Sequence, residues 1–157
     1  MEEESKSIIC VKGHRLSWDH KLNEPFDRYC SQCGSQNIDS CLTCNSFIKG
    51  DGSLSAISNP GPIQNYCHNC GKPYPWTEKK LKDIKDILEL QDEIEQVTRD
   101  KILIEIEEVI HTKNQAESLS LKKLGLLLSK LPLASKKITL DVLKDVLVAK
   151  AIEYLVK

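Results

Sequence analysis

Cys10-Val-Lys-Gly-His14 is the first of four short motifs, and it is followed by Cys30-Ser-Gln-Cys33, Cys41-Leu-Thr-Cys44 and Cys67-His-Asn-Cys70. The four motifs contain all seven cysteines of the 157-residue chain. Together with His14 the cysteines provide eight soft metal donors, arranged as four close pairs. Structural zinc is held by four such donors, which come as close pairs from two separate turns. The spacing therefore predicts two structural Zn²⁺ ions with four protein ligands each.

Sequential pairing of the motifs assigns the ligands of the two ions. The first ion takes Cys10, His14, Cys30 and Cys33, and the second takes Cys41, Cys44, Cys67 and Cys70. The two halves also repeat each other, because each ends in a Tyr-Cys-x-x-Cys-Gly turn, at residues 29–34 and 66–71. A repeat of this kind favours tandem zinc ribbons over a cross-brace, in which the first and third pairs would share an ion. His20 remains an alternative to His14 as the histidine ligand.

Other uses of the cysteines agree less well with the sequence. A disulfide framework needs an oxidising compartment and pairs of cysteines, whereas this chain has seven and opens Met1-Glu-Glu-Glu without an apolar export signal. A thioredoxin-like CxxC usually stands alone beside a βαβ pattern. A catalytic zinc keeps one position open to water, but eight donors for two ions leave none open. We therefore expect structural zinc, reduced thiols and a cytoplasmic location.

The chain after Gly71 has no cysteine and shows helical periodicity. Apolar residues spaced three and four apart predict four helices. Their ranges are about 78–94 with Thr77 as N-cap, from Thr98 or Asp100 to about 111, about 115–130, and from Thr139 or Asp141 to about 155. The predicted fold class is therefore a small metal-bound α+β protein. A double zinc ribbon of short β-hairpins occupies residues 1–76, and a small helical bundle domain occupies 77–157.

Charge is distributed unevenly over the predicted bundle. Residues 77–111 hold eleven acids and six bases, a balance of −5, and residues 112–157 hold four acids and nine bases, a balance of +5. Either the acidic helices pack beside the basic ones, or the basic side chains bind phosphate. A patch of lysine without arginine is weak evidence for sequence reading, because arginine makes the bidentate contacts to guanine. The candidate lysines are Lys122, Lys123, Lys130, Lys136 and Lys137.

Several of these motifs resemble those of a known family. The matching pieces are Cys-x-x-Gly-His at 10–14, Tyr-Cys-x-x-Cys-Gly at 29–34, Cys-x-x-Cys-Asn at 41–45, Ile-Lys-Gly at 48–50 and Tyr-Cys-His-Asn-Cys-Gly-Lys-Pro-Tyr-Pro-Trp-Thr-Glu at 66–78. They are similar to a bacterial family of uncharacterised double-zinc-ribbon proteins, in which a helical region follows the ribbon pair. The resemblance implies zinc binding and a bacterial or phage-like setting, and it implies no reaction.

The predicted function is that of a non-enzymatic zinc-binding interaction module. No Ser-His-Asp order, phosphate-cradling glycine loop or pair of catalytic carboxylates stands out. The ribbons would form a protein-interaction platform, and the helices would dock an unidentified protein partner or a second copy of the chain. The alternative is nucleic-acid binding through the C-terminal lysines, with Trp18, Tyr66, Tyr74 or Trp76 stacking on bases. A third hypothesis is a redox or zinc-release switch. No membrane and no small-molecule substrate are expected.

Overall fold

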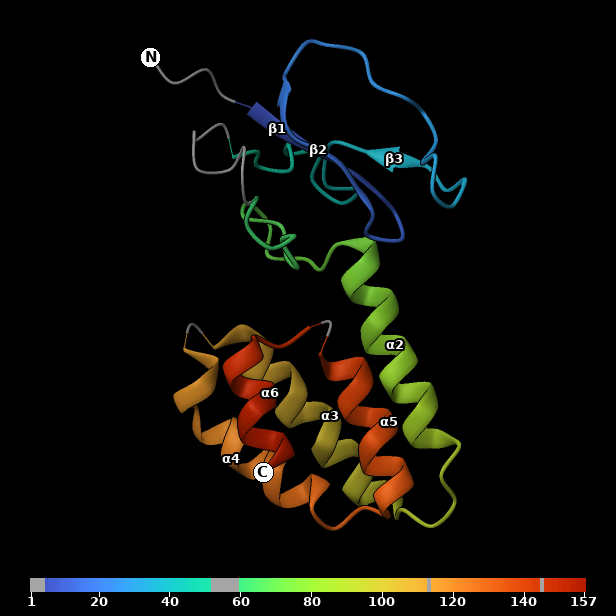
Figure 1. The fold of residues 1–157 in the computed structure, drawn as a ribbon, viewed down its shortest axis with the longest axis vertical. Coiled ribbons are helices and arrows are strands. Elements are labelled where there is room, and N and C mark those ends of the chain that lie inside the picture. Colours follow the sequence, from blue (N-terminus) through green and yellow to red (C-terminus); the bar gives the residue numbers. More distant parts are fainter. Residues whose placement is uncertain (1–4, 52–59, 113, 145) are drawn as a thin grey trace. The chain divides into compact units, whose positions relative to one another are not determined.

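The computed structural model describes residues 5–51, 60–112, 114–144 and 146–157, and the chain divides into two compact units, 1–78 and 79–157 (Figure 1). The fold is of the predicted α+β class, with a three-stranded antiparallel sheet in the first unit and five α-helices among the described residues. Whether residues 1–76 and 77–157 fold as independent domains stays a prediction.

The sheet of the first unit is built around its N-terminal strand. β1 (Ser5–Cys10) lies between β2 (Arg15–Lys21) and β3 (Asn37–Ile38) and is antiparallel to both. Residues Lys6–Cys10 are all buried, as expected for a central strand. A single bridge pairs Lys6 with Lys49 of the second ribbon. The two ribbons therefore meet along β1, rather than forming two separate hairpins.

The apolar core of this unit is small. Its buried cluster consists of Ile9, Ile38, Ile48, Tyr74 and Trp76, together with two of the cysteines, Cys41 and Cys67. The Tyr74 and Trp76 rings stack with centroids 4.8 Å apart. A core of this size provides little hydrophobic stabilisation for a domain, because small domains bury a low fraction of their surface. Another source of stability is needed in this half of the chain.

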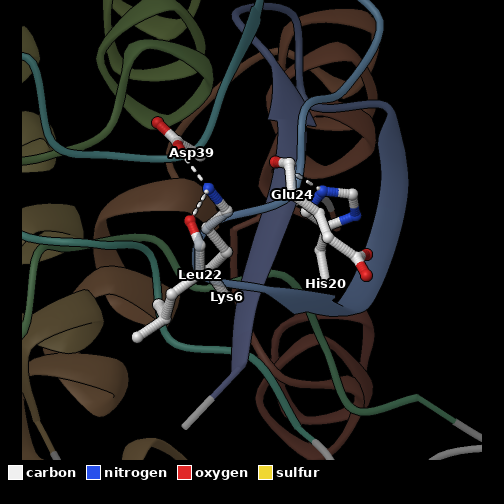
Figure 2. A network of polar contacts seen from close by, with 5 residues as sticks. All are labelled: Lys6, His20, Leu22, Glu24 and Asp39. Carbon is white, nitrogen blue, oxygen red and sulfur yellow. Dashed lines mark hydrogen bonds and ion pairs between the residues drawn. The ribbon is translucent and has the colours of Figure 1, made fainter.

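A buried lysine links the two ribbons (Figure 2). Lys6 is 3% exposed, and its Nζ donates hydrogen bonds to the carbonyl of Leu22 at 2.8 Å and to Oδ2 of Asp39 at 2.7 Å. The same nitrogen lies 5.4 Å from the ring centroids of both Phe26 and Phe47. Burial raises the pKa of Asp39, but the hydrogen bond and charge of Lys6, together with hydrogen bonds from Ser40 and the backbone, outweigh this effect, and the net pKa is lowered. The lysine thus joins β1 to the loop of the first ribbon and to the start of the second.

The second unit is helical, and its first helix begins in the last residues of the first unit. They are α2 (Pro75–Glu89), α3 (Gln96–His111), α4 (Leu119–Leu128), α5 (Leu133–Leu143) and α6 (Ala149–Val156), with a 3₁₀ turn at Gln115–Glu117. α3 packs on α4, and α6 packs on both α4 and α5. In the part of the chain that the structure describes, no helix combines the length and apolar character needed to cross a membrane. Fully buried side chains form the core: Ile102, Ile106, Leu121, Leu124, Leu128 and Leu143.

Two predicted helix starts and one predicted end were wrong. α2 begins at Pro75, ahead of Thr77, because proline suits the first turn of a helix and the Tyr74 carbonyl accepts from the Thr77 N–H at 2.9 Å. α2 ends at Glu89 instead of about 94. The guanidinium of Arg99 donates to the carbonyls of Glu89 at 3.3 Å and Gln91 at 2.5 Å, which stabilises a turn there. α3 then starts at Gln96, before either predicted cap.

The predicted third and fourth helices also differ from the structure. Residues 115–117 form the 3₁₀ turn, and α4 begins only after Ser118, whose Oγ accepts from the Leu121 N–H at 3.0 Å. The C-terminal segment forms two helices instead of one that starts at 139 or 141. Pro132 precedes α5, and Val148 precedes α6 with its N–H donating to Oε1 of Gln115 at 2.8 Å. That contact, made to a distant residue, was not visible in the periodicity.

Candidate metal centres

Three of the four motifs fold into the same tight turn. In each, the N–H of the residue after the second cysteine donates to the carbonyl of the first cysteine. That residue has a positive φ, between 59° and 70°, which turns its N–H inward. Glycine adopts this conformation at little cost, and asparagine tolerates it better than most residues. The donor and acceptor pairs are Gly34 to Cys30 at 2.8 Å, Asn45 to Cys41 at 2.8 Å and Gly71 to Cys67 at 2.9 Å.

The first motif forms a different turn, between β1 and β2. The N–H of Cys10 donates to the His14 carbonyl at 2.9 Å, and the His14 N–H donates to Sγ of Cys10 at 3.3 Å. Gly13 has a φ of 91°, and a Cβ atom at this position would lie 3.1 Å from Cβ of Trp76. Conformation and space therefore both favour glycine. The β-hairpin thus places Cys10 and His14 on one side of the turn.

The structure brings the eight predicted donors together in two groups of four. Within each group the ligand atoms all lie within 4.8 Å of one another, and the groups follow the sequential pairing, not the cross-brace. In the first group, Sγ of Cys10 lies 3.8 Å from Sγ of Cys33, and Nδ1 of His14 lies 3.3 Å from Sγ of Cys33 and 3.7 Å from Sγ of Cys30. In the second group, the Sγ–Sγ distances are 3.7 Å for Cys41 and Cys70 and 3.6 Å for Cys44 and Cys67.

These distances agree with the edges of a tetrahedron around one metal ion. Zinc–sulfur bonds of about 2.3 Å place two sulfurs about 3.8 Å apart, and a zinc–nitrogen bond of about 2.0 Å gives a sulfur–nitrogen edge of about 3.5 Å. A disulfide would instead require about 2.0 Å between the sulfurs, and all seven cysteines are free. The donor atoms and their separations therefore fit one tetrahedral ion in each group.

Hydrogen bonds from the turns favour the thiolate form of two ligands. The hydroxyl and backbone N–H of Ser35 lower the pKa of Cys33 to about 6. The corresponding groups of Ser46 lower the pKa of Cys44 to about 6. Because a metal binds the thiolate rather than the thiol, these serines prepare both sulfurs for coordination. The sequence signal is the serine two residues after the second cysteine of the motif.

The pKa of Cys70, in the second group, is shifted in the opposite direction. The backbone N–H of Lys72 lowers the pKa of Cys70, but desolvation and the side chains of Cys44, Cys41 and Cys67 raise it, and the net pKa is about 12. Four sulfurs at these separations oppose each other's ionisation, because like charges disfavour the charged form. A bound divalent cation removes this opposition and allows all four to coordinate as thiolates.

Comparison with known proteins places the chain in a family. The family model described as an uncharacterised protein conserved in bacteria (DUF2321) matches residues 3–157. The chain belongs to this family. Because the match covers both units, the helical unit of this DUF2321 protein belongs to the family pattern together with the cysteine motifs. Searches of the curated proteins and of the solved structures found no match. The family description names no metal, so the metal centres rest on the residues and distances above.

The remaining histidines of the DUF2321 chain lie outside the two groups. His20, the alternative ligand, donates from Nε2 to the carbonyl of Glu24 at 3.1 Å if that nitrogen carries the proton (Figure 2). Its ring lies edge-on to Phe26 with centroids 6.0 Å apart. His68 is exposed between its two flanking cysteines, and His111 lies at the end of α3 in the other unit. Of the four histidines, only His14 is grouped with cysteines.

Proposed function

We propose that the protein is a non-enzymatic, zinc-binding interaction module with two structural Zn²⁺ ions. The observation that carries the proposal is the presence of four protein donors at tetrahedral separations in each group. A complete set of four protein ligands is typical of structural zinc, whereas catalytic zinc keeps a position for water or substrate. Tetrahedral sites rich in thiolate select zinc or iron–sulfur centres, and the histidine in the first group favours zinc.

Zinc also supplies the stability that the small core of the first unit lacks. In zinc-finger peptides the apparent binding free energy is about 10–16 kcal/mol, and it acts as folding free energy because the site forms only on folding. Here each ion would join two turns that are far apart in the sequence. The two ions would thereby fix the sheet and the turns as a rigid platform.

The surface of the first unit supports the platform role. A groove of about 530 Å³ lies beside the edge strand β2. Its lining combines the apolar residues Ile8, Leu16, Pro25 and Phe26 with the polar residues Ser17, His20 and Asp27. An edge strand beside a groove is a common way to bind an extended peptide, because the backbone pairs with the strand and a side chain enters the groove.

The helical unit offers exposed apolar side chains for docking. Leu119 and Leu126 lie seven residues apart on α4, and therefore on the same face of the helix, and each is 68% exposed. Leu133 at the start of α5 is 84% exposed. Exposed apolar side chains that share one helix face, as Leu119 and Leu126 do, can form part of a surface that binds a partner. A partner protein or a second copy of the chain would cover these side chains.

Nucleic-acid binding has weaker support. Two of the aromatic side chains suggested for base stacking, Tyr74 and Trp76, are buried, with 1% and 2% exposure. Lys123 of α4 forms an ion pair with Glu105 of α3 at 3.3 Å, so part of the basic charge meets the acidic helix within the unit. This contact favours the intramolecular explanation of the charge distribution over a phosphate-binding patch.

The proposal is tested on the full chain purified without added metal or chelator. Native mass spectrometry is expected to show two zinc ions per chain. Sedimentation at increasing concentration tests self-association, and the variant L119E/L126E is expected to weaken any association, while the control K101E, at an exposed position on α3, leaves it unchanged. Fewer than two metals would contradict structural zinc. Retention of DNA or RNA that weakens steeply with salt would instead support the nucleic-acid alternative.

A further inference from the structure

Tyr74 carries a buried hydroxyl group that the fold itself does not use. The residue is 1% exposed, and its hydroxyl oxygen has no hydrogen-bond partner among the described residues. Buried polar groups in native proteins are almost always paired, so an exception calls for an explanation. Phenylalanine would fill the same space and make the same stack on Trp76 without leaving a polar atom unpaired.

The surroundings of this side chain point to the second metal centre. Tyr74 packs in one buried cluster with Cys41 and Cys67. Burial raises the pKa of the Tyr74 hydroxyl, and among the neighbouring side chains the charge of Cys67 raises it most, as expected for a hydroxyl that lies close to this sulfur. The backbone holds the arrangement: the Tyr74 N–H donates to the Asn65 carbonyl at 3.0 Å, and the Cys67 N–H donates to the Lys72 carbonyl at 2.8 Å. The hydroxyl is therefore fixed beside a metal ligand.

The second centre has a greater need for such a donor than the first. Zn²⁺ with four thiolates carries a net charge of −2, whereas with three thiolates and the neutral imidazole of His14 it carries −1. Donors to sulfur already occur around the second centre. Nδ2 of Asn69 donates to Sγ of Cys44 at 3.7 Å. Oγ of Ser46 lies 3.4 Å from the same sulfur, where it accepts from the thiol and can donate to the thiolate.

We propose that the Tyr74 hydroxyl donates a hydrogen bond to the metal-bound Cys67 thiolate and thereby positions this ligand and retains the ion of the second centre. The inference rests on the proposed function, since it requires a metal ion in that centre. Tyr74 is a positioning residue, because it touches a ligand and not the ion. Removing a hydrogen-bond partner of a metal ligand typically weakens metal binding about 10–100-fold.

The test compares the full-length wild type with Tyr74→Phe and with the control Tyr29→Phe, since Tyr29 is 61% exposed. Native mass spectrometry of the wild type comes first, and fewer than two metals there would refute the proposed function, whatever Tyr74 does. Competition with a chromophoric chelator then follows the two zinc ions separately. For Tyr74→Phe we expect one of the two ions to bind at least about tenfold more weakly and the other to bind as in the wild type. Tyr29→Phe is expected to leave both unchanged.

Cobalt substitution identifies the centre that responds. Loss of a hydrogen bond leaves more electron density on the sulfur, so the sulfur-to-cobalt charge-transfer band of the four-cysteine centre is expected to move to lower energy in Tyr74→Phe only. An unchanged spectrum with wild-type affinities would overturn the proposal, and so would equal weakening of both ions. If Tyr74→Phe is isolated with a single metal, retention of the three-sulfur, one-nitrogen centre supports the proposal, and retention of the four-sulfur centre refutes it.

Discussion

The buried ion pair between Lys6 and Asp39 allows a quantitative prediction about how the two ribbons are joined. We consider Lys6→Met, which keeps an unbranched apolar stem between the two phenylalanine rings, and Asp39→Leu, which is close to aspartate in shape. Lys6→Met removes two hydrogen bonds of a charged donor, at 2.7 and 2.8 Å. Bonds of this kind contribute about 1.5–3 kcal/mol each, and a sulfur–aromatic contact offsets a part of the loss.

The two single substitutions are expected to differ in cost. The lysine side chain is 4% exposed and the aspartate side chain 22% exposed, so the carboxylate left behind by Lys6→Met regains some hydration, whereas the ammonium left behind by Asp39→Leu does not. Breaking a buried pair from one side typically costs about 3–5 kcal/mol. We expect about 2–4 kcal/mol for Lys6→Met and about 3–5 kcal/mol for Asp39→Leu. The double variant should recover most of the loss, because no charge then remains buried without a partner.

Tryptophan fluorescence suits this measurement, because both tryptophans of the chain, Trp18 and Trp76, lie in the first unit. Urea unfolding is followed at one fixed free zinc concentration for all variants, since bound metal adds to the apparent stability. The control is Lys21→Met, at an exposed position of β2 in the same unit, which should change the free energy of unfolding by no more than about 0.5 kcal/mol. Single variants as stable as the wild type, or a double variant with the summed loss of both, would refute the reasoning.

Three further predictions concern the metal turns and the helical unit. The pKa of Cys33 and of Cys44 is lowered to about 6, without a metal ion. Each of these thiolates therefore stabilises the fold fully at a pH above the ordinary thiol pKa, and this contribution is lost as the pH falls through about 6. Because a bound metal lowers both pKa values further, zinc release measured with a chromophoric indicator should begin only below about pH 6. Asn45→Gly should leave thermal stability nearly unchanged, whereas Asn45→Val, a β-branched residue at a φ of 59°, should cost about 1–3 kcal/mol in the tryptophan-monitored urea unfolding. Ser118→Ala removes the N-cap of α4 and should lower the stability of the helical unit by about 1 kcal/mol, seen as a lower helical melting temperature by circular dichroism.

The ligand spacing was sufficient to predict both donor groups and the fold class. The reason is local: a Cys-x-x-Cys turn places two sulfurs side by side whatever the rest of the chain does, and four donors per ion limit the possible groupings. Local sequence alone also shows that the turn of the third motif, Cys41 to Cys44, is equivalent to the turns of the second and fourth motifs. The segment Cys44-Asn45-Ser46 parallels Cys33-Gly34-Ser35, with asparagine in the positive-φ position that glycine takes elsewhere.

What the sequence could not show depends on contacts between distant residues. The lysine at position 6 lies in a polar N-terminal segment and gives no local sign of burial, because its partners at positions 22 and 39 are brought to it only by the fold. The break between α5 and α6 has the same origin, since the N–H of Val148 is satisfied by Gln115, 33 residues away. Apolar periodicity continues through such a break, and it therefore predicted one helix where the structure has two.

The position of β1 explains why the two centres belong to one structural unit and not to two independent ribbons. β1 ends in Cys10, a donor of the first group, and its Lys6 holds Asp39, which stands two residues before Cys41 of the second group. β3, which pairs with β1, lies in the segment between the two groups. Displacement of β1 would therefore disturb both a ligand of the first centre, Cys10, and the segment that leads to Cys41 of the second centre. Under the proposed function, two bound ions connected through β1 would stiffen this surface, and a preorganised surface loses less entropy on binding.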